Sequence, residues 1–308
     1  MAKVLVTGGA GFIGSHIVRD LLDRGDQVRV LDNLSTGSKA NLAGLNIDFI
    51  EGDIRDAAVA QESIKNVDAV FHLAAFISVA GSMEDPLACY DANLNGSLNV
   101  LMQADKAGVR RVVLASSAAV YGESESTVDE NHPPTPLSPY AASKLAMEQA
   151  AKLFSQSFNL ETVCLRFFNA YGPRQSPDSP YAAAIPKFIQ VMSAGEPVTI
   201  HGDGRQTRDF VYVGDIVNAM LLAADGESID GRVFNIAGGN SVSINKLVET
   251  LQRFFPEIPD PVFGPPRQGD LLFSEADISL AERALGYRPR IDLQAGLGIT
   301  VEWFRANR

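Results

Sequence analysis

A glycine-rich turn near the start of the chain restricts its possible folds more than any other feature. The apolar run Val4-Leu5-Val6 leads into Thr7-Gly8-Gly9-Ala10-Gly11-Phe12-Ile13-Gly14, and residues 12–24 follow with the apolar periodicity of a helix. Glycines at this spacing allow the tight turn and the close approach of backbone to pyrophosphate that a dinucleotide site requires. The turn therefore predicts a dinucleotide-binding α/β fold. The expected contacts are Gly8, Gly11, Phe12, Ile13 and Gly14.

Short apolar runs alternate with amphipathic stretches along the first half of the chain, which is typical of a parallel sheet with helices on both faces. Strands are expected at residues 3–7, 27–32, 48–51, 69–73, 111–115 and 162–167, and helices at 12–24, about 84–107 and 140–158. Further helices are expected at 185–194, 214–224, 244–254 and 293–305, and the runs 210–213 and 233–236 are expected as strands that could return to the main sheet. We therefore predict a Rossmann-type doubly wound sheet in residues 1–171, with returns from about 206–236, and a smaller C-terminal α/β lobe in 172–308 that mainly binds substrate.

Acidic residues after the second and third expected strands bear on the identity of the dinucleotide. Asp32 stands at about the distance from the glycine turn where a carboxylate accepts hydrogen bonds from the adenosine ribose. A negative charge there repels a 2′-phosphate, and Asn33 supplies no compensating arginine, so NAD is favoured over NADP. Asp53 either accepts a hydrogen bond from the adenine amine or simply caps the next helix.

Tyr140 and Lys144 form a Y-x-x-x-K pair at the start of an expected helix, which puts both side chains on one face a single turn apart. A tyrosine has a pKa near 10, so a base that works near pH 7 needs its phenolate form stabilised by about 4 kcal/mol, which corresponds to about three pKa units. A neighbouring ammonium and the positive charge of a nicotinamide can supply it. We therefore predict that Tyr140 is a catalytic base activated by Lys144.

Ser116 and Ser117 directly follow the fifth expected strand, at the edge where open α/β sheets bind ligands. Ser117 could donate or accept a hydrogen bond with a reacting hydroxyl and align it with Tyr140. The alternative role for both serines is to cap a turn.

The charge and cysteine content of the chain exclude several classes of protein. The formal net charge is −11 and no basic run occurs, which argues against a nucleic-acid surface because such surfaces need clustered lysine and arginine. Cys89 and Cys164 cannot form a disulfide framework, and no two of the four histidines have metal-ligand spacing. No apolar run approaches the roughly 20 residues that span a bilayer. We therefore expect a cytoplasmic protein with no nucleic-acid, membrane or metal partner.

Several of these motifs belong to a longer series that covers nearly the whole chain. Besides Thr7–Gly14 and Pro139–Lys144, the series contains Asp32-Asn33-Leu34-Ser35-Thr36-Gly37, Gly52-Asp53-Ile54-Arg55-Asp56, His72-Leu73-Ala74-Ala75, Asn93-Leu94-Asn95-Gly96-Ser97, Ser116–Gly122, Arg166–Gly172 and Arg208–Asp215. With these motifs the chain resembles the extended short-chain dehydrogenase/reductase family, and within it the UDP-sugar 4-epimerases. The resemblance implies reversible oxidation of a UDP-hexose at C-4 by bound NAD, with Tyr140 accepting the hydroxyl proton.

The resemblance also implies where the two ligands bind. Cofactor contacts are expected, in addition to those above, from Asn33, Ser35, Thr36, Gly37, Ile54, Leu73, Ala74, Ala75, Asn93, Ser116 and Phe167, together with Tyr140 and Lys144. Substrate contacts are expected from Ser78, Ser117, Ala118, Asn169, Ile185, Lys187, Arg208, Arg267, Asp270 and Ser274. Among these, Asn169, Arg208 and Arg267 would bind the diphosphate, because an arginine fork suits phosphate geometry, and Asp270 would bind the uridine ribose.

Two sequence features bear on the reaction and on the sugar. Related dehydratases and decarboxylases carry acidic residues just before the V-Y-G motif, where this chain has Ala118 and Ala119, so epimerisation is the simpler interpretation. Ser274 stands where glucose-restricted relatives carry a bulky aromatic residue, and 180–188 resembles a segment of relatives that act on N-acetylated hexoses. UDP-GlcNAc and UDP-GalNAc are therefore the favoured substrates, with UDP-Glc and UDP-Gal as further ones. Ile77 departs from relatives that have a lysine near the nicotinamide, which puts tight cofactor retention in doubt.

Alternatives remain open at this point. Another nucleotide-sugar epimerase, a 4,6-dehydratase of the same family, or a non-catalytic NAD-binding protein would share most of these motifs. The long helices expected at 84–107 and 140–158 could pair with a second copy in a homodimer, as in relatives, or could merely cover the sheet.

Overall fold

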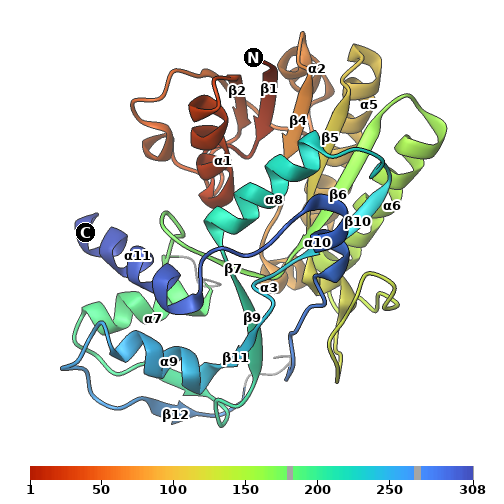
Figure 1. Cartoon of the computed structure of the whole chain (residues 1–308). Coiled ribbons are helices and arrows are strands. Elements are labelled where there is room, and N and C mark those ends of the chain that lie inside the picture. Colours follow the sequence, from red (N-terminus) through yellow and green to blue (C-terminus); the bar gives the residue numbers. More distant parts are fainter. Residues whose placement is uncertain (179–182, 267–271, 308) are drawn as a thin grey trace.

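The computed structural model describes residues 1–178, 183–266 and 272–307. In this part of the chain the central layer is a parallel sheet of seven strands in the order β10-β6-β5-β4-β1-β2-β3 (Figure 1). The strands are β1 (Lys3–Thr7), β2 (Gln27–Asp32), β3 (Asp48–Glu51), β4 (Ala69–His72), β5 (Arg111–Ser117), β6 (Glu161–Phe167) and β10 (Arg232–Ile236). All neighbours pair in parallel, so their carboxyl ends share one edge. The strand order reverses between β1 and β4, which is where open α/β sheets bind ligands.

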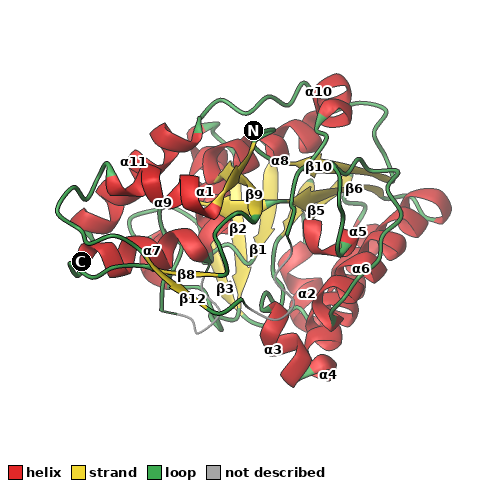
Figure 2. Cartoon of the chain, turned by 90° about the horizontal axis from the view of Figure 1, so that it is seen from below, coloured by secondary structure: helices red, strands yellow, loops and turns green. Residues whose placement is uncertain are grey.

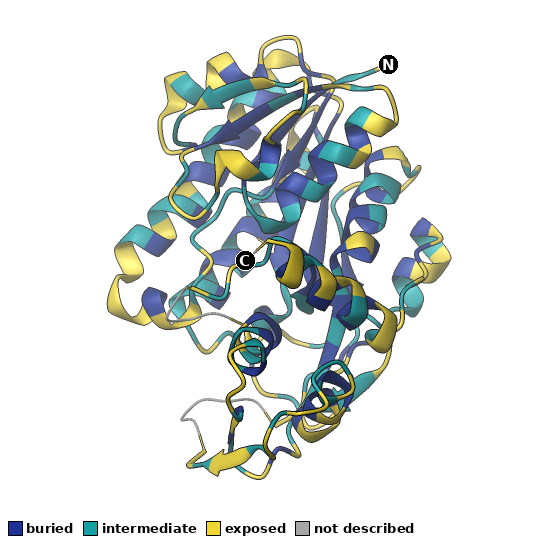
Figure 3. Ribbon diagram, turned by 90° about the vertical axis from the view of Figure 1, so that its left-hand side faces the viewer, coloured by how far each residue is buried: buried dark blue, intermediate teal, exposed yellow. Residues whose placement is uncertain are grey.

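Helices cover both faces of this sheet (Figure 2). One face carries α1 (Phe12–Asp23), α8 (Val213–Asp225) and α10 (Ser279–Leu285), and the other carries α2 (Ala57–Ile64), α5 (Ser97–Ala107) and α6 (Pro139–Ser157). Val4 and Val6 pack into the apolar core of the first face, whereas Leu5 packs into the core of the second. The central strands β1, β4 and β5 are therefore buried almost throughout, as a continuous apolar run predicts, whereas the edge strand β3 is partly exposed (Figure 3). The prediction of a Rossmann-type doubly wound fold is confirmed.

A smaller lobe lies beyond the carboxyl edge of the sheet. Its strands form two small sheets, β11-β9-β7 and β12-β8. Their bounds are β7 (Asn169–Tyr171), β8 (Thr199–His201), β9 (Thr207–Tyr212), β11 (Ser241–Ser243) and β12 (Val262–Gly264). The helices of this lobe are α7 (Ala184–Ser193), α9 (Ile244–Gln252) and α11 (Leu293–Ala306), which share a separate apolar core.

One of the two strands expected to return to the main sheet does not do so. β10 pairs with β6 over its full length, as expected. β9, which covers most of 210–213, instead pairs with β7 and β11, so its expected place in the main sheet is wrong. The reason lies in its burial: side chains of β9 alternate between more and less buried positions, which suits a sheet with one covered face, whereas the end of β10 is continuously buried.

The prediction of a single helix at about 84–107 is also wrong. The segment forms α3 (Val79–Glu84), α4 (Pro86–Tyr90), a π-helical turn η2 (Asp91–Gly96) and then α5. Asp85 caps α4 by accepting a hydrogen bond from the Ala88 amide, and Pro86 occupies the first helical position, so a new helix starts there. The π-helical turn carries Asn93, and such turns are frequent at functional sites. Two short 3-10 helices, η1 (Lys39–Leu42) and η3 (Ala118–Tyr121), complete the connections near the sheet edge.

Candidate active site

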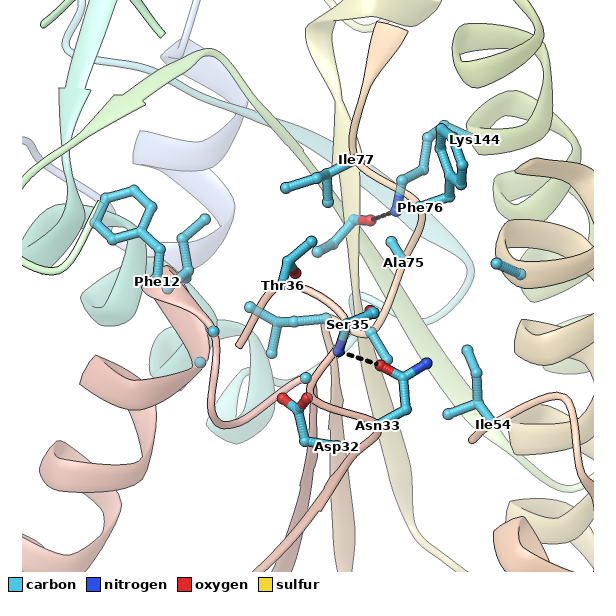
Figure 4. Close-up of a pocket in the computed structure, with 18 of the residues that line it drawn as sticks. Phe12, Asp32, Asn33, Ser35, Thr36, Ile54, Ala75, Phe76, Ile77 and Lys144 are labelled. Carbon is cyan, nitrogen blue, oxygen red and sulfur yellow. Dashed lines mark hydrogen bonds between the residues drawn. The ribbon is translucent and has the colours of Figure 1, made fainter. Parts of the chain in front are cut away.

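A cavity of about 440 Å³ opens at the carboxyl edge of the central sheet (Figure 4). The ends of β1 to β6, or the segments that directly follow them, all contribute to its wall. Of the predicted cofactor contacts, those that line it are Gly8, Gly11, Phe12, Ile13, Gly14, Asp32, Asn33, Ser35, Thr36, Asp53, Ile54, Leu73, Ala74, Ala75, Ser116, Tyr140, Lys144 and Phe167. The parallel sheet thus brings together residues that are far apart in the chain.

The glycine turn between β1 and α1 leaves no room for side chains. Gly8 has a φ of +70°, and a Cβ on it would lie 2.7 Å from the Ala74 nitrogen. A Cβ on Gly14 would overlap the carbonyl oxygen of Gly8 and lie 2.8 Å from the Gly9 Cα. α1 begins after Gly11 without a side-chain cap, so its first amide groups remain available to an anion in the cavity. This cradle fits a dinucleotide pyrophosphate.

Asp32 is held rigidly at the end of β2. One carboxylate oxygen accepts a hydrogen bond from the Ala10 amide at 2.9 Å and the other accepts one from the Leu34 amide at 2.8 Å. Each oxygen keeps a further lone pair, so the carboxylate can still accept two ribose hydroxyls. The geometry fits the role predicted for Asp32.

Asp53 has a more crowded carboxylate than the sequence suggested. One oxygen accepts hydrogen bonds from the amide and Nε of Arg55, and the other accepts from Arg55 Nη2 and from Asn33 Nδ2, at 2.8 to 3.0 Å. These bonds to Arg55, with that from Asn33, hold the pKa of Asp53 well below its usual range against the effect of burial. Four donors occupy the four acceptor positions, so an adenine amine would have to displace one of them.

A chain of buried hydrogen bonds fixes the segment after β4 against the glycine turn. Ser97 Oγ donates to the Asn93 carbonyl at 2.6 Å, so His72 Nε2 donates to Ser97 Oγ at 2.9 Å. His72 Nδ1 is then left to accept from the Thr7 hydroxyl at 2.8 Å, and Thr7 Oγ1 accepts from the Ala74 amide at 3.2 Å. Burial lowers the pKa of His72 to about 3, so the ring stays neutral and this pattern is kept at physiological pH.

Asn93 and Gly37 lie outside the lining of this cavity. Asn93 is buried, accepts a hydrogen bond from the Phe76 amide at 2.7 Å and donates to the Phe76 carbonyl at 3.0 Å. Phe76 itself lines the cavity. Gly37 packs against Ala10, where a Cβ would lie 2.9 Å from its carbonyl carbon. Both residues therefore support wall segments rather than form the wall.

The predicted catalytic residues meet at one end of the cavity. Ser138 caps α6 by accepting a hydrogen bond from the Ala141 amide, and Pro139 follows at the first helical position. Tyr140 and Lys144 then face the cavity from the first turns of α6, and Ser117 faces it from the end of β5. The Lys144 amine is buried and donates to the Ala115 carbonyl at 2.8 Å (Figure 4).

The pKa values of Tyr140 and Lys144 differ in part from the sequence prediction. Burial lowers the pKa of Lys144 to about 8, although nearby Cys164, Cys89 and Glu148 act to raise it. Lys144 thus remains mostly protonated at neutral pH. Burial raises the pKa of Tyr140, and a hydrogen bond with Ser117 offsets this only in part. The protein alone therefore does not make Tyr140 a phenolate, and further positive charge in the cavity is needed.

A second cavity of about 210 Å³ adjoins the first, and Ser117, Phe167 and Phe168 line both. Predicted substrate contacts that line it are Ser117, Ala118, Asn169, Arg208 and Ser274. Asn169 Nδ2 donates to the Asp209 carbonyl at 3.0 Å and to Ser274 Oγ at 3.2 Å, so these segments form one wall.

The other predicted substrate contacts lie elsewhere. Ser78 caps α3 by accepting a hydrogen bond from the Gly81 amide, Ile185 is buried in the core of the smaller lobe, and Lys187 donates to Gln190 on the surface of α7. None of these three lines either cavity. Arg267 and Asp270 lie outside the described residues, as does part of the segment 180–188.

Some lining residues were not predicted. Leu31, Gly52, Arg55 and Phe168 lie at or just after strand ends, a position that could have indicated them. Ala88 and Ala92 reach the cavity from α4 and η2, and no sequence signal marks them.

Comparison with known proteins gives the family. The model of the NAD dependent epimerase/dehydratase family matches residues 4–237. The chain belongs to this family. The prediction of NAD as cofactor agrees with the family's dependence on NAD. The resemblance stated from the motifs is thereby confirmed at the level of the family.

Individual relatives extend over the whole chain. A "Putative UDP-glucose 4-epimerase" of Methanocaldococcus jannaschii is 41% identical over 99% of both chains. A UDP-N-acetylglucosamine 4-epimerase from Methanobrevibacter ruminantium, solved in complex with UDP-N-acetylmuramic acid, superposes with a TM-score of 0.95 at 40% identity, over 100% of this chain and 99% of that one. A UDP-glucose 4-epimerase from Thermotoga maritima, solved with UDP-glucose, has the same TM-score and identity over 99% of both chains.

The family includes other reactions. A protein of Bacillus cytotoxicus named as a UDP-N-acetyl-alpha-D-glucosaminuronate decarboxylase is 32% identical over 98% of both chains.

In the described part of this chain, no helix is both long and apolar enough to cross a membrane.

The glycine turn gives the first testable prediction. Gly14→Ala should weaken NAD binding at least about tenfold, because its Cβ would force Gly8 and Gly9 out of the phosphate cradle. Isothermal titration calorimetry with NAD measures the effect. Gly298→Ala on α11 is the matched control, since its Cβ would meet Phe254 at an ordinary 3.4 Å. Equal NAD affinity of Gly14→Ala and the unmodified protein would contradict the assignment.

Proposed function

We propose that this protein is a UDP-hexose 4-epimerase that interconverts UDP-GlcNAc with UDP-GalNAc, and UDP-Glc with UDP-Gal. The observation that carries the proposal is that Tyr140, Lys144 and Ser117 all line the first cavity, and that Ser117 also lines the second. One cavity fits a dinucleotide, and the other has an arginine, Arg208, suited to a diphosphate. The full-length relatives named as 4-epimerases point to the same reaction.

In this proposal each catalytic side chain has one task. Ser117 holds the C-4 hydroxyl by a hydrogen bond, and Tyr140 accepts its proton. NAD, when bound, supplies the hydride acceptor and later the donor, and its oxidised form adds positive charge to the cavity. The Lys144 ammonium stabilises the phenolate form of Tyr140. When the keto sugar is reduced on its other face, Tyr140 returns the proton to the C-4 oxygen, so no net redox change occurs.

The two alanines that follow Ser117, Ala118 and Ala119, favour epimerisation over dehydration. Among the described residues, the carboxylates that line the two cavities are Asp32, Asp53 and Glu275. Asp32 ends β2, Asp53 follows β3, and Glu275 accepts hydrogen bonds from Thr127 and Ser241. The positions beside Ser117 are alanines, so water elimination lacks an evident acid.

Product analysis tests the proposed reaction directly. The protein is incubated with UDP-GlcNAc and, separately, with UDP-Glc, and the products are followed by NMR. We expect mixtures of the C-4 epimers without added NADH. A lasting 4-keto-6-deoxy sugar would instead identify a 4,6-dehydratase, and a stoichiometric need for NADH would identify a net reductase.

Tyr140→Phe should keep its affinity for NAD but lose turnover by roughly 10³-fold, because a positioned general base commonly contributes 10² to 10⁴. Turnover is measured by epimer formation and NAD affinity by calorimetry. Tyr90→Phe removes a hydroxyl from the exposed side of α4 and should leave turnover unchanged. Full activity of Tyr140→Phe would remove the proposed base.

Ser274 supports activity on N-acetylated sugars because it is a small residue in the wall of the second cavity. Ser274→Tyr should lower kcat/KM for UDP-GlcNAc at least about tenfold more than for UDP-Glc, since added bulk excludes the acetamido group. Ser274→Ala loses the hydrogen bond to Asn169 without adding bulk and should retain both substrates. An equal loss on both sugars in Ser274→Tyr would refute the argument from size.

We also propose that the protein is a homodimer formed through α5 and α6. A partly exposed apolar stripe runs along α4, η2 and α5 with a spacing of four residues, and it consists of Tyr90, Leu94, Leu98 and Met102. Leu153 is 53% exposed on the neighbouring helix α6. Such a stripe on two adjacent helices can pack against its own copy in a four-helix arrangement.

Met102→Glu should convert the dimer to a monomer, because it would put a charge into the apolar contact. Mass measurement by light scattering reports the change. Ile299→Glu, at an equally exposed apolar position on α11, should leave the dimer intact. A monomeric unmodified protein would contradict the proposed assembly.

A further inference from the structure

A third polar residue continues the line of Tyr140 and Lys144 along α6. Glu148 lies one turn beyond Lys144, so the three side chains share one face of the helix. Lys144 donates to the end of β5 through the Ala115 carbonyl. Glu148 is only 4% exposed, although no role was predicted for it.

Glu148 connects α6 to both strands beneath it. Arg166 of β6 binds its carboxylate with two parallel hydrogen bonds, from Nε at 2.9 Å and from Nη2 at 2.7 Å. Ser116 of β5 donates its hydroxyl to the same carboxylate. Ser116 directly precedes Ser117, so the contact fixes the end of β5 where the predicted catalytic serine lies.

Arg166 is linked to the wall of the second cavity through Tyr121. Its guanidinium carbon lies 4.7 Å from the centre of the Tyr121 ring, and Tyr121 lines that cavity. The Tyr121 hydroxyl donates to Asn235 of β10 at 2.6 Å. One buried ion pair thus ties α6, β5, β6 and the wall of the second cavity together.

We propose that Glu148 and Arg166 are positioning residues that fix the register of α6 on β5 and β6, and so hold Tyr140 against Ser117. The inference rests on the proposed role of Tyr140 as the base. Stability alone does not account for the pair, because a buried ion pair can often be replaced by apolar residues at little cost in stability. Two charges with directional, bidentate bonds define a register that apolar side chains would leave free to shift.

The ion pair of Glu148 and Arg166 also affects the protonation of Lys144. The groups that face Glu148 or Lys144 from the surrounding elements are Arg166 and Cys164 of β6, Cys89 of α4 and His72 of β4, and Tyr121 of η3 faces Arg166. Glu148 acts to raise the pKa of Lys144, and its removal would also leave the buried Arg166 charge uncompensated. Loss of Glu148 alone should therefore favour the neutral amine, whereas loss of both charges should not.

Three variants separate register from charge. Glu148→Gln removes one charge, and Glu148→Gln combined with Arg166→Met removes both. Glu161→Gln is the matched control. Glu161 at the start of β6 pairs with the buried Arg111 at the start of β5, so this ion pair joins the same two strands at the ends far from the cavity. Each protein is assayed for kcat and KM with UDP-GlcNAc, for thermal unfolding, and for the titration of Lys144 by ¹³C-lysine NMR without substrate.

The expected pattern is specific to a positioning role. Both Glu148 variants should lose at least about tenfold in kcat with KM changed less than about threefold, because small misplacements of reacting groups are costly. The Lys144 titration should move down by about one pH unit in Glu148→Gln and return towards its normal midpoint in the double variant. Glu161→Gln should match the unmodified protein in kcat and in the titration.

The outcomes distinguish this inference from the proposed function. No turnover by the unmodified protein would overturn the proposed function. Normal turnover by that protein and by the double variant would overturn the positioning role, as would an equal loss of kcat in Glu161→Gln. An unchanged Lys144 titration in Glu148→Gln would show that the pair is not coupled to the ammonium.

Discussion

The buried ammonium of Lys144 is the constraint on which the architecture of the site depends. Moving an ammonium out of water is costly, and the lowered pKa of about 8 reflects that cost. The group remains charged at neutral pH because its hydrogen bond to the Ala115 carbonyl and the nearby Glu148 offset part of the cost. This requires α6 to lie close along β5, and the same closeness brings Tyr140 to the cavity.

The sheet supplies the rest of the geometry through a simple property of parallel strands. Because all carboxyl ends meet at one edge, residues 8, 32, 74 and 117 become neighbours without any long-range sequence signal. Hydrogen bonds then fix the segments to one another, as between Thr7, His72 and Ser97. The neutral state of His72 keeps this link unchanged over the physiological pH range.

The sequence could predict features that depend on local spacing. Gly8, Gly14, Asp32 and the pair Tyr140 and Lys144 each belong to a short motif, and the structure brings all of them to one cavity. It could not predict features that depend on which segments pack together. Asn93 supports Phe76 from a π-helical turn, Ile185 is buried in the smaller lobe, and β9 joins a separate sheet, all for reasons of tertiary contact. Nor did the sequence indicate that Arg55 would occupy the acceptor positions of Asp53.

The two cavities are built in different ways, and this difference bears on how the family varies. Much of the lining of the dinucleotide cavity lies at the ends of the central strands or just after them, so the sheet largely determines the shape of the cavity. The second cavity is lined by side chains from separate segments, such as Asn169 of β7, Arg208 of β9 and Ser274, which strand pairing and the hydrogen bond from Asn169 to Ser274 hold together. A side chain added at Gly8 or Gly14 in the first would displace backbone, whereas a change at Ser274 in the second alters the room for the sugar. One scaffold can therefore keep its cofactor while relatives act on different sugars.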